Sequence, residues 1–315
     1  MSDPGTQLLK NRQTGGLLWR ILKNKEVYLI LLPGIAWYVI FAYLPMYGLT
    51  LAFKTFRANL GIFRSPWVGL ANYINVFRDP AFLESVFRTL RINGGRLLFQ
   101  FPFPIVLALI INEVRVGRTK KILQTIYTFP HFLSWVLVAS ILTNILSQSG
   151  MVNAVIRLAG GQPVNFLGST SIFLPLVYIT EIWKSSGWSA IIYLASIAGI
   201  DSEQYEAAEI DGATRFQRIL HISLPGIQGT VTVMFILAVG YIMSAGFDQL
   251  FNLSNAATFR EAETLDMYIY RVTFRSATDF SFSTAVSLFR SIVNFITLIT
   301  ADRVMKLVSG QGLFG

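Results

Sequence analysis

The stretch Glu206-Ala207-Ala208-Glu209-Ile210-Asp211-Gly212, followed by Ile222 and Leu224-Pro225, is the most informative part of this chain. It has the form Glu-Ala-Ala, three residues, Gly, nine residues, Ile, one residue, Leu-Pro. The stretch is charged, and it lies between two long apolar runs. The apolar runs indicate the class of fold, and the charged stretch between them is the part of the chain that says most about function.

The composition is that of a membrane protein. Hydrophobic residues make up 53% of the 315 residues and charged residues only 14%, whereas a soluble domain carries about 25% charged residues. A helix that crosses a bilayer needs about 20 mostly apolar residues. Six segments meet this requirement, at about residues 27–51, 92–112, 122–146, 171–199, 227–250 and 282–301.

These segments predict an all-α, polytopic membrane protein with six transmembrane helices and no strands. Internal Pro and Gly are compatible with this, because neighbouring helices can satisfy the backbone groups that they free. The first apolar run is too long for a cleaved signal peptide and has no small-residue cleavage site, so we expect it to stay as a span. The predicted organisation is a tail at 1–26, a transmembrane domain at 27–306 with an elbow at 201–225, and a tail at 307–315.

Basic residues indicate the orientation. The N-terminal tail carries five Lys or Arg residues and the short loop after the second span carries four, and both lie on one side of a six-span chain. Short basic loops favour the cytoplasm, so both termini are predicted to be cytoplasmic. The long loop on the other side also carries five basic residues between Lys54 and Arg88. The net charge of +9 suits contact with anionic membrane lipid, and the scattered basic residues argue against nucleic-acid binding.

The residues needed for catalysis or for holding a cofactor are missing. There is no G-x-x-x-x-G-K-[ST] phosphate loop. There are no cysteines, and the two histidines, His131 and His221, have no partner cluster with metal-ligand spacing. We therefore expect this chain to hold no catalytic residue, no metal and no cofactor, and any ATP hydrolysis to occur on another polypeptide.

The charged stretch has features of a short helical elbow. Asp201 and Gln204 resemble a capping box that opens a helix, and Gly212 can end that helix by adopting positive φ. Pro225 suits the first turn of the fifth span. Ala207 and Ala208 leave a low surface that another protein can approach closely.

The Glu-Ala-Ala stretch resembles the signature loop of the membrane subunits of binding-protein-dependent ABC importers. Further segments are similar to the oligosaccharide permeases of that family, in the branch that includes alginate and plant-polysaccharide importers. These segments include Leu32-Pro33-Gly34, Tyr43-Leu44-Pro45-Met46-Tyr47-Gly48, Trp67-Val68-Gly69-Leu70-Ala71-Asn72-Tyr73, Pro130-His131-Phe132-Leu133-Ser134-Trp135 and Trp183-Lys184-Ser185-Ser186-Gly187-Trp188. The resemblance covers about residues 29–306 and implies the type I importer permease fold.

The resemblance also implies partners and roles. Such a permease forms half of a pathway with a second homologous permease subunit, and two ATPase subunits, which bind the ATP and Mg, dock at the elbows. An extracytoplasmic solute-binding protein delivers the oligosaccharide, and alternating access moves it. The residues that the resemblance places at the ATPase contact are Glu206, Ala207, Ala208, Asp211, Gly212, Ile222, Leu224 and Pro225, with the Glu206 carboxylate facing a basic partner.

Candidate residues for the sugar pathway are aromatic or hydrogen-bonding. Trp183 and Trp188 in the fourth span, with Tyr241, Asp248 and Gln249 in the fifth, lie in regions that line the sugar path in maltose-type permeases. The alternative for each Trp is a packing or interfacial role.

Two charged residues lie deep within predicted spans. Glu181 and Arg290 are each about 12–15 Å from the outer end of their helix, at 1.5 Å per residue. Ionisable groups at such depth normally find a partner, so we predict that Glu181 and Arg290 form an ion pair. Lys184 is a competing partner for Glu181 by its i, i+3 spacing, and Arg290 could instead snorkel outward.

Other functions fit the sequence less well. A permease for a non-sugar solute is the nearest alternative. A stand-alone channel would need rings of charge or carbonyls, and a membrane-embedded enzyme would need convergent His, Asp or Glu residues inside the spans. Neither pattern is present.

Overall fold

The structure is a computed structural model that describes residues 23–114, 117–276 and 279–314. Within these ranges the regular structure is helical, apart from one isolated antiparallel bridge between Lys54 and Trp67. Most of the predicted N-terminal tail lies outside the described residues, as does Arg115 of the basic loop. The prediction of an all-helical fold is therefore confirmed for the described part of the chain.

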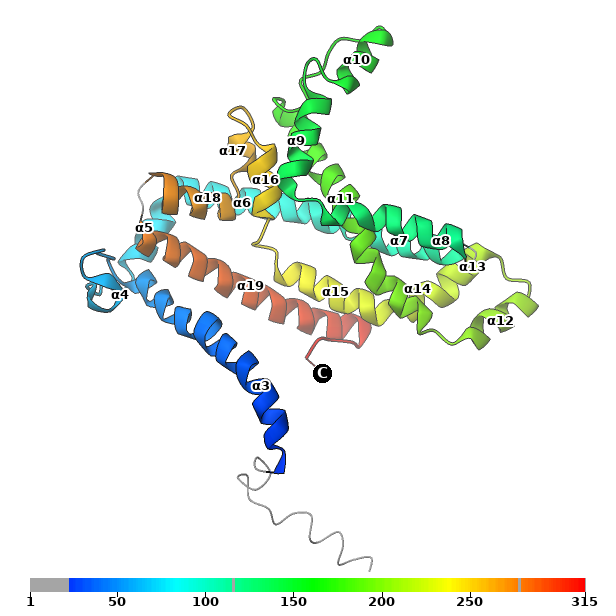
Figure 1. The fold of residues 1–315 in the computed structure, drawn as a ribbon, viewed down its shortest axis with the longest axis horizontal. Helices are drawn as coiled ribbons and strands as arrows, with labels where there is room; N and C mark the ends of the chain where they lie inside the picture. The colour runs from blue at the N-terminus through cyan, green and yellow to red at the C-terminus, as the bar shows by residue number, and fades with distance from the viewer. Residues whose placement is uncertain (1–22, 115–116, 277–278, 315) are drawn as a thin grey trace, which may run out of the picture.

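The α-helices follow one another with few long loops (Figure 1). Their bounds are α3 Lys25–Tyr38, α4 Gly61–Arg64, α5 Ala71–Arg78, α6 Pro80–Gly95, α7 Pro102–Glu113, α8 Arg118–Thr128, α9 Trp135–Leu146, α10 Met151–Leu158, α11 Thr170–Ala198, α12 Ser202–Ile210, α13 Arg215–Arg218, α14 Leu224–Gly226, α15 Gln228–Gly240, α16 Phe247–Leu253, α17 Phe259–Ala262, α18 Leu265–Tyr270 and α19 Phe280–Ser309. Wider π-helical turns lie at Val39–Tyr43, Arg96–Gln100, Ile219–Ser223 and Arg271–Ser276, and 3-10 segments at Leu44–Phe53 and Phe129–Phe132.

Four helical segments among the described residues are long and apolar enough to cross a membrane. They are Lys25–Phe53, Pro80–Glu113, Trp135–Leu158 and Phe280–Ser309. The segments Arg215–Gly226 and Gln228–Gly240 make a fifth if they count as one span, with a bend of 61° between them. α11 is a single helix of 29 residues, but its polar residues lower its mean hydropathy and it does not belong to this group.

Two predicted spans are interrupted in the structure. The segment predicted at 122–146 breaks after Thr128, where Pro130 stands in a 3-10 turn, and restarts at α9 with Ser134 as its N-cap. The segment predicted at 227–250 stops at Gly240 and resumes at Phe247 as α16. The prediction of continuous helices there is wrong. Pro130 cannot donate the amide hydrogen bond that a continuous helix needs, and the break after Gly240 is held by side chains from distant parts of the chain.

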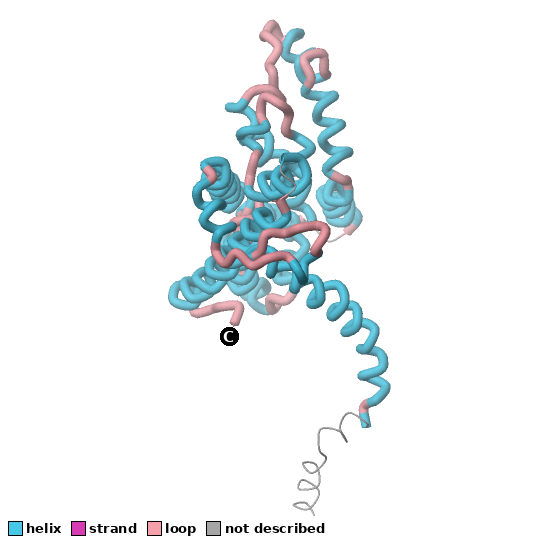
Figure 2. The backbone as a smooth tube through the Cα atoms, turned by 90° about the vertical axis from the view of Figure 1, so that its left-hand side faces the viewer, coloured by secondary structure: helices cyan, strands magenta, loops and turns pink. Residues whose placement is uncertain are grey.

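The helices form a bundle with three apolar clusters. The first lies around Ile92, Phe173 and Leu250, the second joins residues of α7, α11 and the start of α15, and the third joins α5, α6, α18 and α19. In Figures 1 and 2, α3 leans away from this bundle, and no residue of α3 is buried. α12 and α13 lie at one end of the bundle, and α4 and α5 lie at the opposite end.

A buried phenol links α18 to the start of α6. The Tyr268 hydroxyl donates a hydrogen bond of 2.6 Å to the Asp79 carboxylate, and Asp79 also caps α6 by accepting from the Ala81 amide. Burial raises the pKa of Tyr268, and the bond to Asp79 raises it further. The phenol therefore stays protonated and keeps donating over the physiological pH range.

Candidate functional site

The elbow between α11 and α15 begins with a capped helix. The Asp201 carboxylate accepts a hydrogen bond of 3.0 Å from the Glu203 amide, which satisfies a free amide at the start of α12. α12 runs from Ser202 to Ile210, between the predicted cap at Asp201 and the predicted stop at Gly212. Beyond its end, Gly212 has a φ of 74°, and the Ala213 amide bonds back to the Ala208 carbonyl at 2.8 Å. This is the hydrogen bond of a Schellman turn, for which a glycine is suited.

The elbow is fastened to the bundle by side chains. The hydroxyls of Tyr205 and Ser223 lie 2.9 Å apart and join α12 to the turn before α14. The Arg218 guanidinium lies 3.8 Å from the Glu209 carboxylate and 4.0 Å from that of Glu113, at the end of α7. These contacts attach α12 and α13 to the end of α7 and to the turn before α14.

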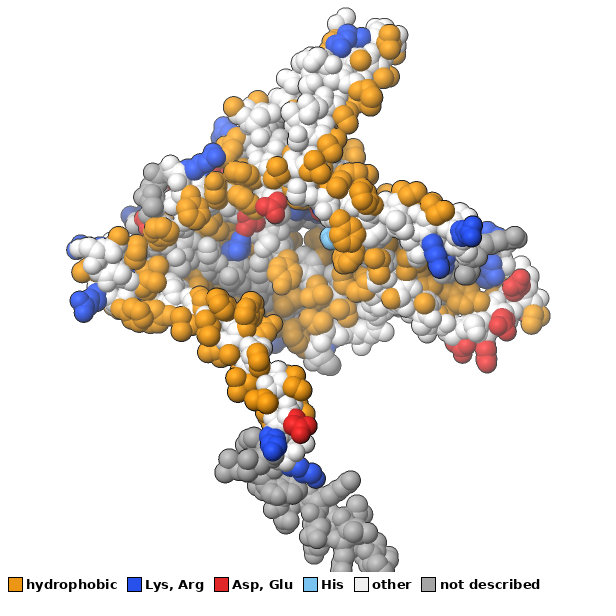
Figure 3. All heavy atoms as spheres, viewed as in Figure 1, with side chains coloured by type: hydrophobic (Ala, Val, Ile, Leu, Met, Phe, Trp, Pro, Cys, Tyr) orange, Lys and Arg blue, Asp and Glu red, His pale blue; other side chains and the backbone are white. Residues whose placement is uncertain are grey.

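The outer surface of the elbow is both acidic and apolar. Figure 3 shows acidic side chains gathered over α12, next to basic side chains over α8. Two apolar side chains are unusually bare, since Ile210 is 87% exposed and Phe216 is 68% exposed. Of the residues predicted at the ATPase contact, Glu206, Ala207, Asp211, Gly212, Leu224 and Pro225 are exposed, while Ala208 and Ile222 are half-buried. Bare apolar residues among carboxylates are suited to contact with another protein.

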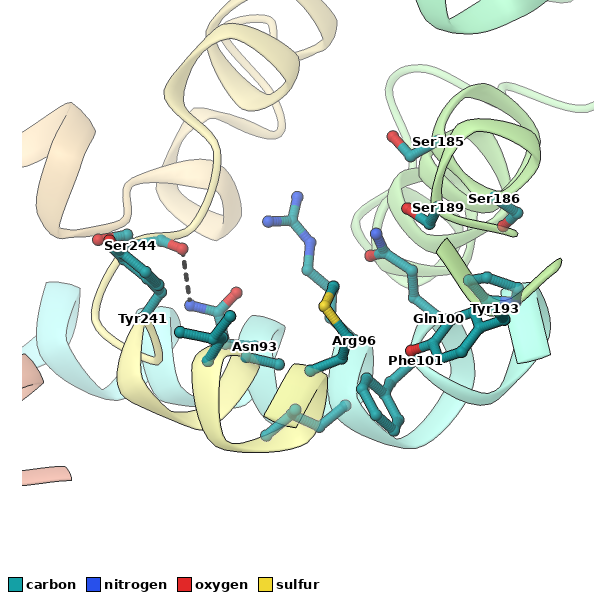
Figure 4. A pocket seen from close by; sticks show the side chains of 15 residues that line it. Asn93, Arg96, Gln100, Phe101, Ser185, Ser186, Ser189, Tyr193, Tyr241 and Ser244 are labelled. Atoms are coloured by element: carbon teal, nitrogen blue, oxygen red, sulfur yellow. Dashed lines mark hydrogen bonds between the residues drawn. The ribbon is translucent and has the colours of Figure 1, made fainter. Parts of the chain in front are cut away.

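A cavity of about 330 Å³ lies inside the bundle, between the segment around Arg96, α11 and the end of α15. Figure 4 shows its walls. Its polar lining consists of Asn93, Arg96, Gln100, Ser185, Ser186, Ser189, Tyr193, Tyr241 and Ser244, and the remaining residues are apolar. A small number of hydrogen-bonding groups in an otherwise apolar cavity is typical of a site for a small ligand.

The helix break at 241–246 forms one edge of this cavity. Tyr241 and Ser244 line the cavity, and the chain leaves the break at Gly246, whose φ is 71°. Irregular backbone at membrane depth is tolerated where it is buried in protein or lines a cavity. Broken helices of this kind are a recurrent element of transporter substrate sites.

Side chains from three other segments satisfy the free backbone groups of the break. Asn93 donates to the carbonyls of Ile242 and Ser244, at 2.6 and 3.2 Å. Arg96 donates to the Ala245 carbonyl at 2.8 Å. The break is therefore held from the α6 side by an amide and a guanidinium.

The opposite side of the break is held by acceptors. The Met243 amide donates to Asn294 of α19 at 3.0 Å, and the Ala245 amide donates to Asp266 of α18 at 3.2 Å. Asp266 also forms an ion pair with Arg290 of α19. The backbone amides and carbonyls that lack helical hydrogen bonds at the break are thus bonded to side chains of other helices.

The predicted pathway residues have different environments. Tyr241 is 66% exposed and lines the cavity. Asp248 lies exposed on α16. Gln249 is only 1% exposed; its amide donates to the Val177 carbonyl and to Thr180, while its oxygen accepts from Arg96. Gln249 therefore fixes α16 and Arg96 in place rather than facing the cavity.

The two tryptophans of α11 do not line this cavity. Trp183 lines a separate, apolar cavity with residues of α9. Trp188 stacks on His131 with ring centroids 4.7 Å apart, and Phe132 lies at its edge. The structure thus brings Trp188 together with the segment between α8 and α9, not with Tyr241.

The predicted ion pair between Glu181 and Arg290 is wrong. Arg290 pairs with Asp266, and the Glu181 carboxylate accepts a hydrogen bond of 2.6 Å from Ser185. The prediction compared only how far each residue lies from the outer end of its helix. It did not consider which faces of α11 and α19 the two side chains occupy, and each side chain has a partner elsewhere. Lys184, the alternative partner, donates instead to the His131 carbonyl at 2.8 Å and lies over the ring of Trp135.

Metal-binding groups are absent from the part of the chain that the structure describes. No group of three or more His, Asp or Glu side chains there is close enough to hold a metal ion. The candidate functional features of the described residues are therefore the exposed elbow and the polar cavity.

Comparison with known proteins identifies the family. The sequence profile described as "Binding-protein-dependent transport system inner membrane component" matches residues 101–309, which include the elbow and the part of the cavity wall from Phe101 onward. The chain belongs to this family. It is accordingly a multi-pass permease of the inner, cytoplasmic membrane and not an enzyme.

Relatives extend the match over nearly the whole permease. It is 38% identical to the polygalacturonan/rhamnogalacturonan transport system permease protein YteP of Bacillus subtilis, over 98% of this chain and 96% of that protein. It matches a solved bacterial ABC transporter for import of the acidic polysaccharide alginate with a TM-score of 0.85 and 36% identity, over 93% of this chain and 99% of that one. A trehalose/maltose transport system permease protein, MalF of Thermococcus litoralis, is 30% identical over 73% of this chain and 76% of that protein.

Sequence reasoning overlooked the residues that build the centre of this permease. Arg96, Asn93 and Gln100 line the cavity, and none of them was predicted to have a role. One feature does point to Arg96, because a basic residue in the interior of an apolar run is costly and normally functional. Asn294 and Asp266 carry no such feature, since a polar residue on a helix can face solvent, protein or a cavity.

Proposed function

We propose that this permease forms half of the translocation pathway for an oligosaccharide in an ATP-driven ABC importer. The observation that carries the proposal is the polar cavity at the break of α15, which offers hydroxyls, amides and an aromatic ring inside the bundle. Sugars present many hydroxyls and an apolar ring face, and such a lining matches both. The names of the polygalacturonan and alginate relatives support a carbohydrate substrate.

The proposed path crosses the membrane among six helices. α11 is one of these six spans, although it is less apolar than the others. Its residues Ser185, Ser186 and Ser189 line the cavity. Both termini and the elbow lie on the cytoplasmic side, and the segment from α4 to α6 faces outward. In this arrangement α11 is polar because it lines the pathway.

The proposed partners match surfaces that this chain leaves bare. A second homologous permease subunit covers α3, whose residues are not buried. Two ATPase subunits, which hold ATP and Mg, dock at the elbows of the two permeases through the Glu206, Ala207 and Ile210 surface. An extracytoplasmic solute-binding protein delivers the sugar, as a periplasmic protein accompanies the related alginate transporter, which this chain matches with a TM-score of 0.86 and 35% identity over 95% of its length.

The elbow provides the mechanical connection. When ATP closes the ATPase dimer, α12 moves with it, and the contacts of Tyr205 and Arg218 transfer that motion to the neighbouring membrane helices. The cavity at the helix break then opens alternately to the two sides. The chain itself contributes no step of hydrolysis.

The test is uptake by the reconstituted complex. The permease, its second permease, the ATPase subunits and the binding protein are placed in liposomes, and uptake of a labelled panel of neutral and acidic oligosaccharides is measured with and without ATP. The proposal expects uptake of at least one oligosaccharide that depends on ATP and on the binding protein. A complex that assembles and hydrolyses ATP but imports none of the panel, and imports a non-sugar solute instead, contradicts it.

A further inference from the structure

Arg96 is a charged residue at the centre of a membrane-crossing segment. Arg96 stands at the middle of the 34-residue helical segment Pro80–Glu113, which is long and apolar enough to cross a membrane. A charged group there carries a high desolvation cost and by default marks a substrate path or a paired site. In the described part of the chain Arg96 has no carboxylate within ion-pair distance.

Two neutral acceptors hold this guanidinium in one orientation. It donates to the Ala245 carbonyl at 2.8 Å and to the Gln249 oxygen at 2.5 Å. Arginine has five N–H donors, and its buried Nε has no partner. Figure 4 shows the side chain of Arg96 reaching into the space between the serines of α11 and the Asn93 and Ser244 side.

Two further buried polar atoms in the cavity wall have no partner either. They are the Gln100 side-chain oxygen and the Ser186 hydroxyl. Buried polar groups are nearly always hydrogen-bonded, so unsatisfied ones in a cavity indicate a missing ligand or water. The three atoms together call for a ligand that accepts from a guanidinium and also exchanges hydrogen bonds with an amide and a hydroxyl.

The local charges leave one positive charge uncompensated. Glu181 interacts electrostatically with Arg96 and also, together with Lys184, with His131. Lys184 is 7% exposed, stands at the middle of α11, and has a carbonyl and an aromatic ring as its partners. Arg96, Lys184 and Glu181 therefore lie in one group of interacting charges, two positive and one negative, while Arg290 is already paired with Asp266. One additional carboxylate would balance the group.

We propose that Arg96 is a specificity-determining residue that selects an oligosaccharide bearing carboxylates, such as a chain of uronic acids. This inference rests on the proposed oligosaccharide transport and names its substrate class. The carboxylate accepts from the free N–H groups of Arg96, and the sugar hydroxyls bond to Gln100 and the serines of α11. Glu181 limits the affinity, so that the acidic sugar is released rather than trapped at the bottom of the cavity.

The experiment compares an acidic sugar with its neutral counterpart. The complete transporter is reconstituted with each permease variant, and uptake of trigalacturonate and of its fully methyl-esterified form is measured. Because the same binding protein delivers both sugars in every variant, its own preference cancels when the acid-to-ester uptake ratio is compared with that of the wild type. Arg96→Gln should lower this ratio about tenfold, the effect of losing one charge-assisted hydrogen bond.

Two further variants separate selection from folding. Glu181→Gln removes the opposing carboxylate and should raise the acid-to-ester ratio, an outcome that mere damage to the fold would not produce. Arg91→Gln is the matched control, because Arg91 is on the same helix but pairs with Glu261 outside the cavity, and it should leave the ratio unchanged. If the complex that carries Arg96→Gln does not assemble, the acid-to-ester uptake ratio of Glu181→Gln decides whether the inference holds.

The outcomes separate this inference from the proposed function. Active uptake with an acid-to-ester ratio that neither the Arg96 nor the Glu181 substitution changes overturns the role of Arg96 and leaves oligosaccharide transport standing. A ratio that falls in Glu181→Gln also overturns it. Failure of the wild-type complex to import any oligosaccharide contradicts the proposed function itself.

Discussion

Arg96 and Arg290 both lie within long apolar helices, but their surroundings differ. Arg290 pairs with Asp266, and both side chains are largely buried. Removing one partner of such a pair leaves the other charge uncompensated, so Arg290 belongs to the support of the helix break. Arg96 has only neutral acceptors and faces a cavity. Arg290 therefore serves the scaffold alone, whereas Arg96 both supports the break through the Ala245 carbonyl and presents its remaining donors to the cavity.

At Gly187 the backbones of two helices approach closely. A Cβ built there would lie 1.9 Å from the carbonyl oxygen of Tyr127, at the end of α8. Backbone cannot move aside as a flexible side chain can, so any larger residue must push α11 and α8 apart. This contact positions the face of α11 that carries the cavity serines.

We expect Gly187→Ala to destabilise the protein by about 1–3 kcal/mol, the usual cost of overpacking. The measurement is thermal unfolding of the purified permease complex. Gly94→Ala is the control, because Gly94 is helical with nothing within 4 Å of an added Cβ, and this change should be neutral or stabilising by up to about 1 kcal/mol. Equal melting temperatures for Gly187→Ala and the wild type would show that the close approach does not exist.

At the scale of the element, the elbow depends on one backbone conformation. Gly212 has a φ of 74° and open space around it, so a substitution there acts through backbone strain alone. Gly212→Val should cost about 1–3 kcal/mol locally and displace the surface of α12. We predict that uptake falls while ATP hydrolysis by the complex continues or the ATPase subunits dissociate.

The matched variant is Gly212→Asn, since asparagine visits the left-handed region more readily than valine. It should retain most of the coupling between hydrolysis and uptake. Glu206→Lys, which reverses an exposed charge without strain, should weaken ATPase association. Normal uptake in both Gly212→Val and Glu206→Lys would refute the role of the elbow.

The elements that could be predicted are those specified by neighbouring residues. α12 follows from the Asp201 cap, the alanine-rich centre and the terminating glycine, and its range agrees with the structure. The helix predicted at 171–199 is found at 170–198, and apolar residues recur on both sides of its polar centre. In both cases the determining interactions lie within one or two turns of the chain.

The helix break at 241–246 could not be predicted in the same way. Its sequence, Tyr-Ile-Met-Ser-Ala-Gly, is mostly apolar and continues the hydropathy of α15. The groups that make the break stable are Asn93, Arg96, Asp266 and Asn294, which come from other helices. The Glu181–Arg290 pair failed for the same reason, since depth in the membrane does not say which faces of two helices meet.

At the scale of the whole molecule, α3 stands out because none of its residues is buried. No residue in the most apolar stretch of the membrane-crossing segment Lys25–Phe53 is buried, and Figure 3 shows the segment covered with hydrophobic side chains. It contacts the bundle mainly through its second half, where Leu51 and Ala52 are buried. A helix that leaves the bundle in this way presents a long surface for a neighbouring subunit.

Site-specific photo-crosslinking tests which partner meets each bare surface. Trp37 on α3 is 57% exposed and Phe216 on the elbow is 68% exposed, and both can be replaced singly by the photo-reactive aromatic residue benzoylphenylalanine at little cost in shape. In the assembled complex we expect position 37 to form an adduct with the second permease, because the proposed second permease covers α3, and position 216 to form one with an ATPase subunit. Omitting the ATPase subunits should abolish only the second adduct. Adducts of position 37 with lipid alone would mean that α3 is a free membrane anchor, and the pathway would then have to be built without it.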